Sequence, residues 1–484
     1  MGCPYLGGLF SGGEVQSTVK SSSVLGFGSG SVFGCGFSIG EREGLLRGVD
    51  MVQFGLSLMA EEPDELREGY WFFRGVDDGF DLCFKAHLLS IPTTGKISCT
   101  GWRAWMTVTR REYLKRVAGV AAGVVLTGRG MAAMRDGREA ITGKRSLKAR
   151  AAARGMLTGC AVNADLFRQD ANFRSLLAEQ YSILVPENCL KWNMLRPTPD
   201  TYSFTDADSL VAFAEAHGMK VRGHNFVWHE ALPKWFASTV TKENARKYLV
   251  DHITAVGGRY KERIHSWDVV NEAIWVKDGR VDGMRSSSPW FEMLGPEYID
   301  IAFRTAREVD PKALLTYNEY GIEYDTEDEG KKRTATLALL HRMKAANVPL
   351  DALGIQSHLH ADGKADFSKG IRELMDGARE LGLQVFVTEM DVNDDKVTSD
   401  DIAQRDQAVA DVYRDYLTTA FRGPEVKAVL TWGASDRNTW LNKGTKFRPL
   451  HPDRLQRPLP FDADYAPKKA FFAMRDSFDG AKKR

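Results

Sequence analysis

Short apolar runs alternate with longer amphipathic stretches along the chain from about residue 155. The apolar runs are rich in Val, Ile and Leu, and their length is typical of buried strands. In longer stretches such as 205–218 and 367–382, apolar residues recur every three or four positions and a glycine follows, which predicts helices. Eight strands are expected, at residues 156–162, 181–188, 220–228, 264–272, 314–320, 352–358, 384–392 and 426–433.

Alternating strands and helices predict a parallel sheet with right-handed crossovers. Eight such units within residues 151–478 favour an α/β fold, a closed (β/α)8 TIM barrel. A doubly wound open sheet is the alternative. It is less favoured because no G-x-G-x-x-G sequence follows the first strand.

The first part of the chain lacks this alternation. Residues 1–40 contain 11 Gly and 8 Ser, a composition that buries too little apolar surface to offset the entropy of the chain. Residues 41–105 are mixed and show no clear period. We therefore expect a low-complexity, disordered region at residues 1–105.

Residues 106–134 are similar to a twin-arginine export signal. They contain the pair Arg110-Arg111, then an apolar run over 117–126, then small residues. The run is shorter than the roughly 20 residues that span a bilayer, so no stable membrane span is expected. The alternative is an Arg-Arg pair that opens a cytosolic helix.

A signal acts at the N-terminus of a chain. We therefore expect translation to start at Met106 and residues 1–105 to be a wrongly extended reading frame. Residues 135–150 are expected to be a linker. On this interpretation the protein is exported to the periplasm or secreted.

Charge and cysteine content exclude several functions. The formal net charge is +1, so nothing attracts the whole molecule to nucleic acid. The six cysteines form no C-x-x-C pair and no zinc-type spacing, so no metal is expected. Cys160 and Cys189 are interpreted as buried free thiols, although pairing between them stays open.

Polar and aromatic residues gather where the predicted strands end. In a barrel, chemistry lies at the carboxyl ends of the strands. Carboxylates in or next to apolar strands are among these residues, which is typical of a carbohydrate-cleaving site. The strand-end residues are Glu187, Asn188, His224, Trp228, Asn271, Glu272, Asn318, Tyr320, Gln356, His358, Glu389, Asp391 and Trp432.

Glu272 and Glu389 lie on the fourth and seventh predicted strands, on opposite sides of such a barrel. Glycosidic bond cleavage needs two carboxyl groups, one to protonate the leaving oxygen and one to attack the sugar or activate water. A separation of about 5 to 5.5 Å would retain the anomeric configuration, and about 6.5 to 9.5 Å would invert it.

Several motifs also resemble a known family. "VPENCLKW", "GHNFVWHEALPKWF", "WDVVNEAI", "TYNEYGIE", "GIQSHLH", "VTEMDV" and "TWGASDRNTW" are similar to the ordered motifs of glycoside hydrolase family 10. The resemblance covers roughly residues 150–478. It implies a retaining endo-β-1,4-xylanase that acts on xylan and xylo-oligosaccharides without a cofactor, and we expect a monomer.

The resemblance also implies residue roles. Glu272 is the expected acid/base and Glu389 the nucleophile, while Asn271 bonds the sugar 2-hydroxyl. His358 holds Glu389, and Asp391 orients His358. The remaining expected substrate contacts are Glu187, Asn188, Lys191, His224, Trp228, Tyr320, Gln356, Trp432 and Trp440.

The sequence departs from the family pattern at a few positions. Glu230-Ala231 stands where Ser-Gln is usual, Asn225-Phe226 where Thr-Leu is usual, and Gly321 where Asn is common. These changes leave subsite preference open. A β-1,4-glucanase on the same scaffold is the main alternative. A non-catalytic sugar-binding barrel would be expected to lack one of the two carboxylates.

Overall fold

The computed structural model describes six strands between residues 32 and 109, and then residues 141–363, 366–443 and 450–484. The chain divides into two compact units, Met1–Arg135 and Asp136–Arg484. Among the described residues, no helix combines the length and apolar character needed to cross a membrane.

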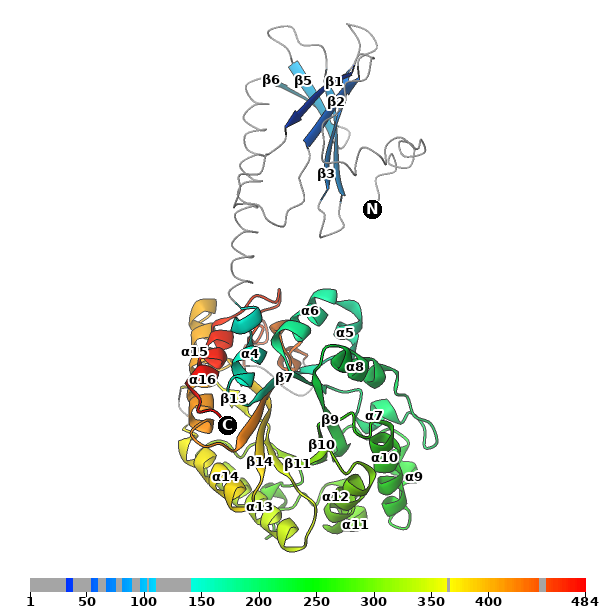
Figure 1. Ribbon diagram of the computed structural model, residues 1–484, viewed down its shortest axis with the longest axis vertical. Helices are drawn as coiled ribbons and strands as arrows, with labels where there is room; N and C mark the ends of the chain where they lie inside the picture. The colour runs from blue at the N-terminus through cyan, green and yellow to red at the C-terminus, as the bar shows by residue number, and fades with distance from the viewer. Residues whose placement is uncertain are drawn as a thin grey trace. The chain divides into compact units, whose positions relative to one another are not determined.

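The first unit contains a six-stranded antiparallel sheet whose strands follow chain order (Figure 1). The strands are β1 (Val32–Phe37), β2 (Phe54–Met59), β3 (Arg67–Arg74), β4 (Asp81–Leu88), β5 (Lys96–Gly101) and β6 (Ala104–Thr109). This differs from the disorder expected for residues 1–105, since even β1 lies within the 40 residues rich in Gly and Ser. The strand β3, "REGYWFFR", instead contains aromatic residues that favour strands.

The expected boundary at Met106 falls inside β6 (Ala104–Thr109). Residues 110–140, which hold most of the expected signal and part of the linker, lie outside the described residues. The start at Met106 and the export signal therefore stay predictions.

The second unit is a closed parallel barrel, as predicted. Neighbouring strands pair in the order β12-β11-β10-β9-β8-β7-β15-β14, and β12 pairs with β14 to close the ring. The strands are β7 (Leu157–Val162), β8 (Ile183–Pro186), β9 (Lys220–Val227), β10 (Ser266–Asn271), β11 (Leu314–Glu319), β12 (Ala352–Ile355), β14 (Gln384–Asn393) and β15 (Val426–Thr431).

The strand predicted at 352–358 is broken. Ser357 has a φ of 64°, and the chain resumes as the short strand β13 (His358–His360), which pairs with the far end of β14. A left-handed residue ends the regular pleat of a strand. The break lies between Gln356 and His358, so these two residues do not share one strand face.

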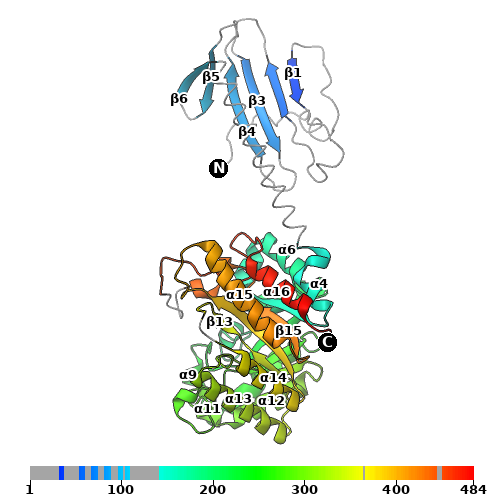
Figure 2. The ribbon, with the colours of Figure 1, turned by 90° about the vertical axis from the view of Figure 1, so that its left-hand side faces the viewer.

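Helices surround the barrel (Figure 1). The longer ones are α6 (Ala171–Gln180), α8 (Thr205–Ala216), α10 (Ala245–Arg259), α12 (Glu297–Val309), α13 (Glu327–Ala345), α14 (Ser368–Glu380), α15 (Ile402–Ala420) and α16 (Lys469–Gly480). The shorter ones are α4 (Leu147–Ala152), α5 (Ala164–Gln169), α7 (Trp192–Leu195), α9 (Phe236–Thr239) and α11 (Pro289–Leu294). Figure 2 shows α16 beside α15.

The folded unit begins before the predicted boundary at residue 151. Leu147 is fully buried, and its backbone N–H donates to Oε1 of Gln180 (3.1 Å). Ser146 caps α4, accepting from the N–H of Ala149. The end of the predicted linker is therefore part of the barrel unit.

A buried ion pair lies inside the barrel. Arg222 from β9 donates through Nε to Oδ1 of Asp268 in β10 (3.0 Å) and reaches the carbonyl of Thr388 in β14 (3.3 Å). His224 Nδ1 lies 2.8 Å from the other oxygen of Asp268. Buried charges are tolerated when they are paired in this way. Cys160 and Cys189 are free and buried, as interpreted from the sequence.

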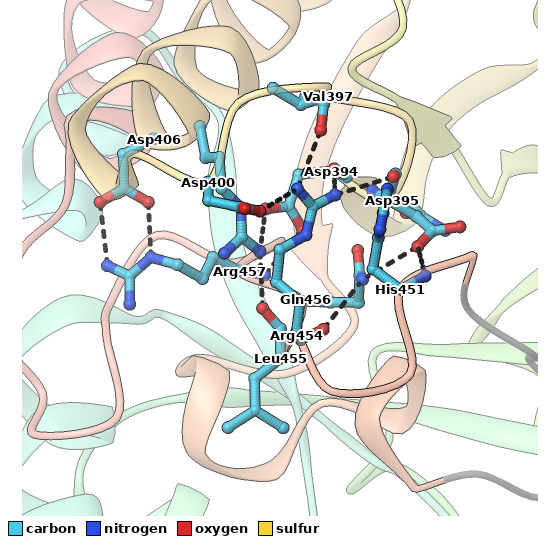
Figure 3. A network of polar contacts seen from close by, with 12 residues as sticks. Asp394, Asp395, Val397, Asp400, Asp406, His451, Arg454, Leu455, Gln456 and Arg457 are labelled. Carbon is cyan, nitrogen blue, oxygen red and sulfur yellow. Dashed lines mark hydrogen bonds and ion pairs between the residues drawn. The ribbon is translucent and has the colours of Figure 1, made fainter.

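The long segment after β15 is tied to the loop after β14 (Figure 3). The carboxylate of Asp395 accepts the backbone N–H groups of Leu450 (2.8 and 2.9 Å) and His451 (3.3 Å). Arg454 donates to the carbonyls of Val397 (2.9 Å) and Asp395 (2.8 Å). The two loops thus form one connected polar network beside the barrel.

Candidate active site

Glu272 follows β10 directly and has a left-handed backbone, with φ of 59°. Its N–H donates to the carbonyl of Asn318 (2.9 Å), and its carbonyl accepts from Nε of Arg285 (2.9 Å). Its Oε1 accepts from the amides of Asn271 (2.9 Å) and Gln356 (3.0 Å). Backbone and side chain are therefore both fixed by neighbouring strands.

The surroundings of Glu272 favour its protonated form. Burial raises its pKa, and the negative charges of Glu319 and, to a smaller extent, Glu389 raise it further. Hydrogen bonds from Gln356 and Trp228 oppose the rise without cancelling it. A carboxyl group with a raised pKa is suited to donate a proton.

Glu389 lies within β14 and is 4% exposed. Its Oε1 accepts from Nδ2 of Asn318 (2.7 Å), and its Oε2 lies 3.4 Å from Nε2 of His358. The other ring nitrogen of His358 is 2.9 Å from Oδ1 of Asp391, whose second oxygen accepts from Trp440 (2.7 Å). Glu389, His358, Asp391 and Trp440 therefore form one continuous chain of polar contacts.

The surroundings of Glu389 favour its ionised form. Burial alone would raise its pKa, but the hydrogen bond from His358 and the positive charges of His224, His358 and Arg222 lower it to about 2. Burial would lower the pKa of His358, but Asp391 and Glu389 outweigh this and raise it well above the usual value. His358 is therefore a cation beside the carboxylate.

Asn318 joins the two carboxylate environments. Its Nδ2 donates to Oδ1 of Asn271 (2.8 Å) as well as to Glu389, while its Oδ1 accepts from Thr388 (2.8 Å). The ionised carboxylate of Glu389 only accepts, so Nδ2 of the amide faces it, and the Thr388 hydroxyl donates to the other end. Asn271 in turn donates to Glu272, so a chain of amides separates the two acids.

One side of the site carries the predicted sugar-binding group. Lys191 donates to Oδ1 of Asn188 (3.1 Å), and its ammonium lies 5.0 Å from the ring centre of Trp228 and 5.7 Å from that of Trp432. Glu187 forms an ion pair with Lys443 at 3.3 Å. The structure thus brings these predicted residues together.

Three predicted contacts have environments that the sequence did not indicate. His224 is 2% exposed, bonds Asp268 and lies against the edge of Trp432 (ring centres 5.2 Å apart). One face of Tyr320 is covered by Lys332, 3.5 Å from the ring centre. Trp440 lies edge-on to His358, 5.4 Å between ring centres. Their contacts with sugar stay predictions.

Three further residues that shape the site received no role from the sequence: Asn318, Arg285 and Glu319. Asn318 ends a strand, which was the signal available, but its shared amide depends on strand register. Arg285 lies on a loop with no distinguishing pattern. Glu319 is adjacent to Asn318 and points behind the site. Among the described residues, no group of three or more acidic, His or Cys side chains is placed to hold a metal ion.

The fold and the paired acids define a glycoside hydrolase, and comparison specifies the family. Residues 146–477 match the model of glycosyl hydrolase family 10. The match covers more than half of the chain, so the protein belongs to this family, and the resemblance noted in the sequence is confirmed.

Individual relatives agree. A β-1,4-xylanase of Dictyoglomus thermophilum is 36% identical over 312 residues, covering 62% of this chain and 83% of the relative. The structure of xylanase 10B from Thermotoga maritima has a TM-score of 0.62 and 32% identity, covering 69% of this chain and 98% of its own. Xylanase 10B from Thermotoga petrophila, solved with xylobiose, also has a TM-score of 0.62 and 32% identity, over 69% and 97% of the two chains.

Replacing His358 should raise the pKa of Glu389. In His358→Gln the carboxylate loses its neighbouring cation, so its titration moves from about 2 toward the ordinary range of glutamate. Carbon-13 NMR titration of glutamate carboxyl carbons would measure this, with the signal assigned from Glu389→Gln. His360→Gln, two residues away on β13, is the control. An unchanged titration in His358→Gln would show that His358 does not set this pKa.

Proposed function

We propose that this protein is a retaining endo-β-1,4-xylanase, with Glu272 as acid/base and Glu389 as nucleophile. The observation that carries this proposal is the opposite protonation preference of the two acids at one barrel mouth. Family membership supports the reaction class and the retaining course.

In the first step, Glu389 attacks the anomeric carbon while Glu272 transfers its proton to the glycosidic oxygen, and the C–O bond breaks. The aglycone leaves as an alcohol, and the glycone becomes an ester of Glu389. Asn271, held by Asn318 and next to Glu272, is placed to bond the 2-hydroxyl of the reacting sugar. Such a contact strengthens as the sugar approaches an oxocarbenium ion.

In the second step, water attacks the anomeric carbon and Glu272 takes its proton. Esterified Glu389 carries no charge, so one of the effects that raise the pKa of Glu272 is gone and ionised Glu272 is favoured. Glu389 then leaves as a carboxylate, and the cationic His358 beside it stabilises that charge. Two inversions at one carbon give net retention.

Xylan is the proposed substrate because the relatives are named as xylanases and one was solved with xylobiose. The group of Asn188, Lys191, Trp228 and Trp432 offers hydrogen-bonding groups and flat apolar faces, which suit pyranose rings. A glucan differs by its C5 hydroxymethyl group, so direct comparison of the two polymers is informative.

Proton NMR of the initial products should test the reaction. Xylan should give β-configured reducing ends first, with internal cleavage that lowers viscosity before much reducing sugar forms. Rates on soluble carboxymethyl cellulose should be lower by at least about tenfold, since a poorly fitting group costs on the order of 1–3 kcal/mol. Initial α-products would contradict retention, and faster cellulose hydrolysis would favour the glucanase alternative.

The two acids should respond differently to the leaving group. Glu389→Ala should abolish turnover of every glycoside, because no ester can form. Glu272→Ala should slow formation of the ester from unactivated xylo-oligosaccharides roughly 10²–10⁴-fold. Cleavage of a dinitrophenyl xylobioside should slow far less, because that leaving group needs little protonation.

Pre-steady-state rates of leaving-group release would measure this difference. Glu308→Ala, an exposed residue on α12, is the matched control and should behave as the wild type. Equal losses for both leaving groups in Glu272→Ala would argue against its role as the acid.

We also infer that the protein is exported and acts as a monomer. The Arg110-Arg111 pair followed by an apolar run supports the export route. Changing both arginines to lysine should retain the enzyme in the cytoplasm, measured by cell fractionation of the producing cells. Arg129→Lys, beyond the apolar run, is the control. Normal export of the double variant would exclude this signal, and light scattering of the exported enzyme would give its oligomeric state.

A further inference from the structure

The connection that runs from the last residue of β11 to α13 carries two buried carboxylates that the proposed reaction does not use. Glu319 is fully buried and Glu323 is 2% exposed. Strand β11 pairs with β10 on one side and with β12 on the other. The connection is therefore placed between the segment that carries Glu272 and the segment that carries Gln356 and His358.

Glu319 holds the segment that follows Glu272. Its Oε2 accepts the backbone N–H of Ile274 (3.1 Å) and the hydroxyl of Tyr317 (2.6 Å). Its Oε1 accepts from the N–H of Tyr320 (3.1 Å) and pairs with Lys332 at 2.8 Å. Ile274 lies two residues after Glu272, whose left-handed backbone is uncommon for a residue with a side chain.

Glu323 holds the break between β12 and β13 in the same way. Its Oε1 accepts the backbone N–H of Ser357 (2.7 Å), and its Oε2 accepts that of Ile322 (2.7 Å). Ser357 is left-handed, and its hydroxyl lies 2.7 Å from that of Tyr416. This residue separates Gln356, which bonds Glu272, from His358, which faces Glu389.

Both left-handed turns are thus held by a buried carboxylate from the same short connection. An isolated left-handed residue with a side chain is energetically unfavourable and persists only where its surroundings fix it. We propose that Glu319 and Glu323 are positioning residues, Glu319 for Glu272 and Glu323 for Gln356 and His358. The inference rests on the proposed function, because it concerns how those side chains are oriented for the reaction.

Electrostatics add a second role for Glu319. After burial, its negative charge is the largest influence that raises the pKa of Glu272. The charged and titratable groups near Glu319 are Lys332, Tyr298, Tyr317, Tyr320 and Glu272. Those near Glu323 are His358, Tyr324, Glu329 and Tyr416.

Glu319→Gln should lower kcat on unactivated xylo-oligosaccharides on the order of 10- to 100-fold, the effect of a slightly misplaced catalytic group. KM should change little. Pre-steady-state release of the phenolate from a dinitrophenyl xylobioside, which reports the first step alone, should slow much less. The alkaline limb of kcat/KM should move to lower pH. Loss of the neighbouring anion lowers the pKa of Glu272, so Glu272 loses its proton at a lower pH and the alkaline limb moves with it.

Glu323→Gln should lower kcat by a similar factor on both substrates, because His358 and Glu389 act whatever the leaving group. The acid limb should move to higher pH as His358 loses its position beside Glu389. Glu327→Gln is the matched control. It removes one carboxylate from the first turn of α13, where the side chain is exposed and pairs only with Lys331 among the described contacts. It should leave kcat, KM and both limbs unchanged.

Glu319→Gln leaves Lys332 without its anion and could fail to fold, since an unpaired buried charge is strongly destabilising. The double variant Glu319→Gln/Lys332→Met removes both charges and should show the same selectivity for poor leaving groups. Folding would be checked by circular dichroism. If both variants are unfolded, or if Glu319→Gln slows good and poor leaving groups equally with unmoved limbs, positioning of Glu272 is overturned. The positioning role of Glu323 is overturned if the acid limb of the pH profile does not move in Glu323→Gln.

Carbon-13 NMR titration of Glu272 separates this proposal from the proposed function. If the wild-type protein cleaves no xylan, the function is wrong, yet Glu319→Gln should still lower the pKa of Glu272. If the wild type cleaves xylan and that pKa does not move, the function stands and the electrostatic role of Glu319 fails.

Discussion

The site depends on keeping two carboxyl groups at one barrel mouth in different protonation states. Both Glu272 and Glu389 are removed from most solvent, which by itself favours the neutral acid in each case. Neighbouring charges determine the difference in protonation between the two carboxyl groups. His358 faces Glu389 directly, whereas the largest charge effect on Glu272 comes from the anion of Glu319. Burial of both groups therefore yields an acid just after β10 and a carboxylate on β14.

The barrel interior supplies part of this asymmetry. Arg222 crosses from β9 toward β14, and His224 stands in register with Asp268 on the next strand. These groups are far from the solvent that would screen their charge, so they act on Glu389 more strongly than surface residues would. The interior ion pair is thus connected to the reaction as well as to the stability of the barrel.

The sequence was sufficient for the barrel and its eight strands, because these depend on local periodicity. It was insufficient wherever the outcome depends on contacts between distant segments. The left-handed Ser357 looks like any strand residue until Glu323 is placed beside it. The shared amide of Asn318 requires the register of β10, β11 and β14. The sheet at residues 32–109 was not expected, because residues 41–105 show no clear period and the first strand, β1, lies within the stretch rich in Gly and Ser.

The network around Asp395 has a consequence for sequence variation (Figure 3). This carboxylate holds the segment after β15 through the backbone N–H groups of Leu450 and His451, not through their side chains. Leu450 is 67% exposed, so its side chain contributes little to the attachment. At these two positions the anchor contacts only the main chain, so almost any residue except proline is tolerated there. Relatives can therefore differ in sequence at these positions while the backbone keeps its path. Substitutions there should have little effect on the stability of the barrel.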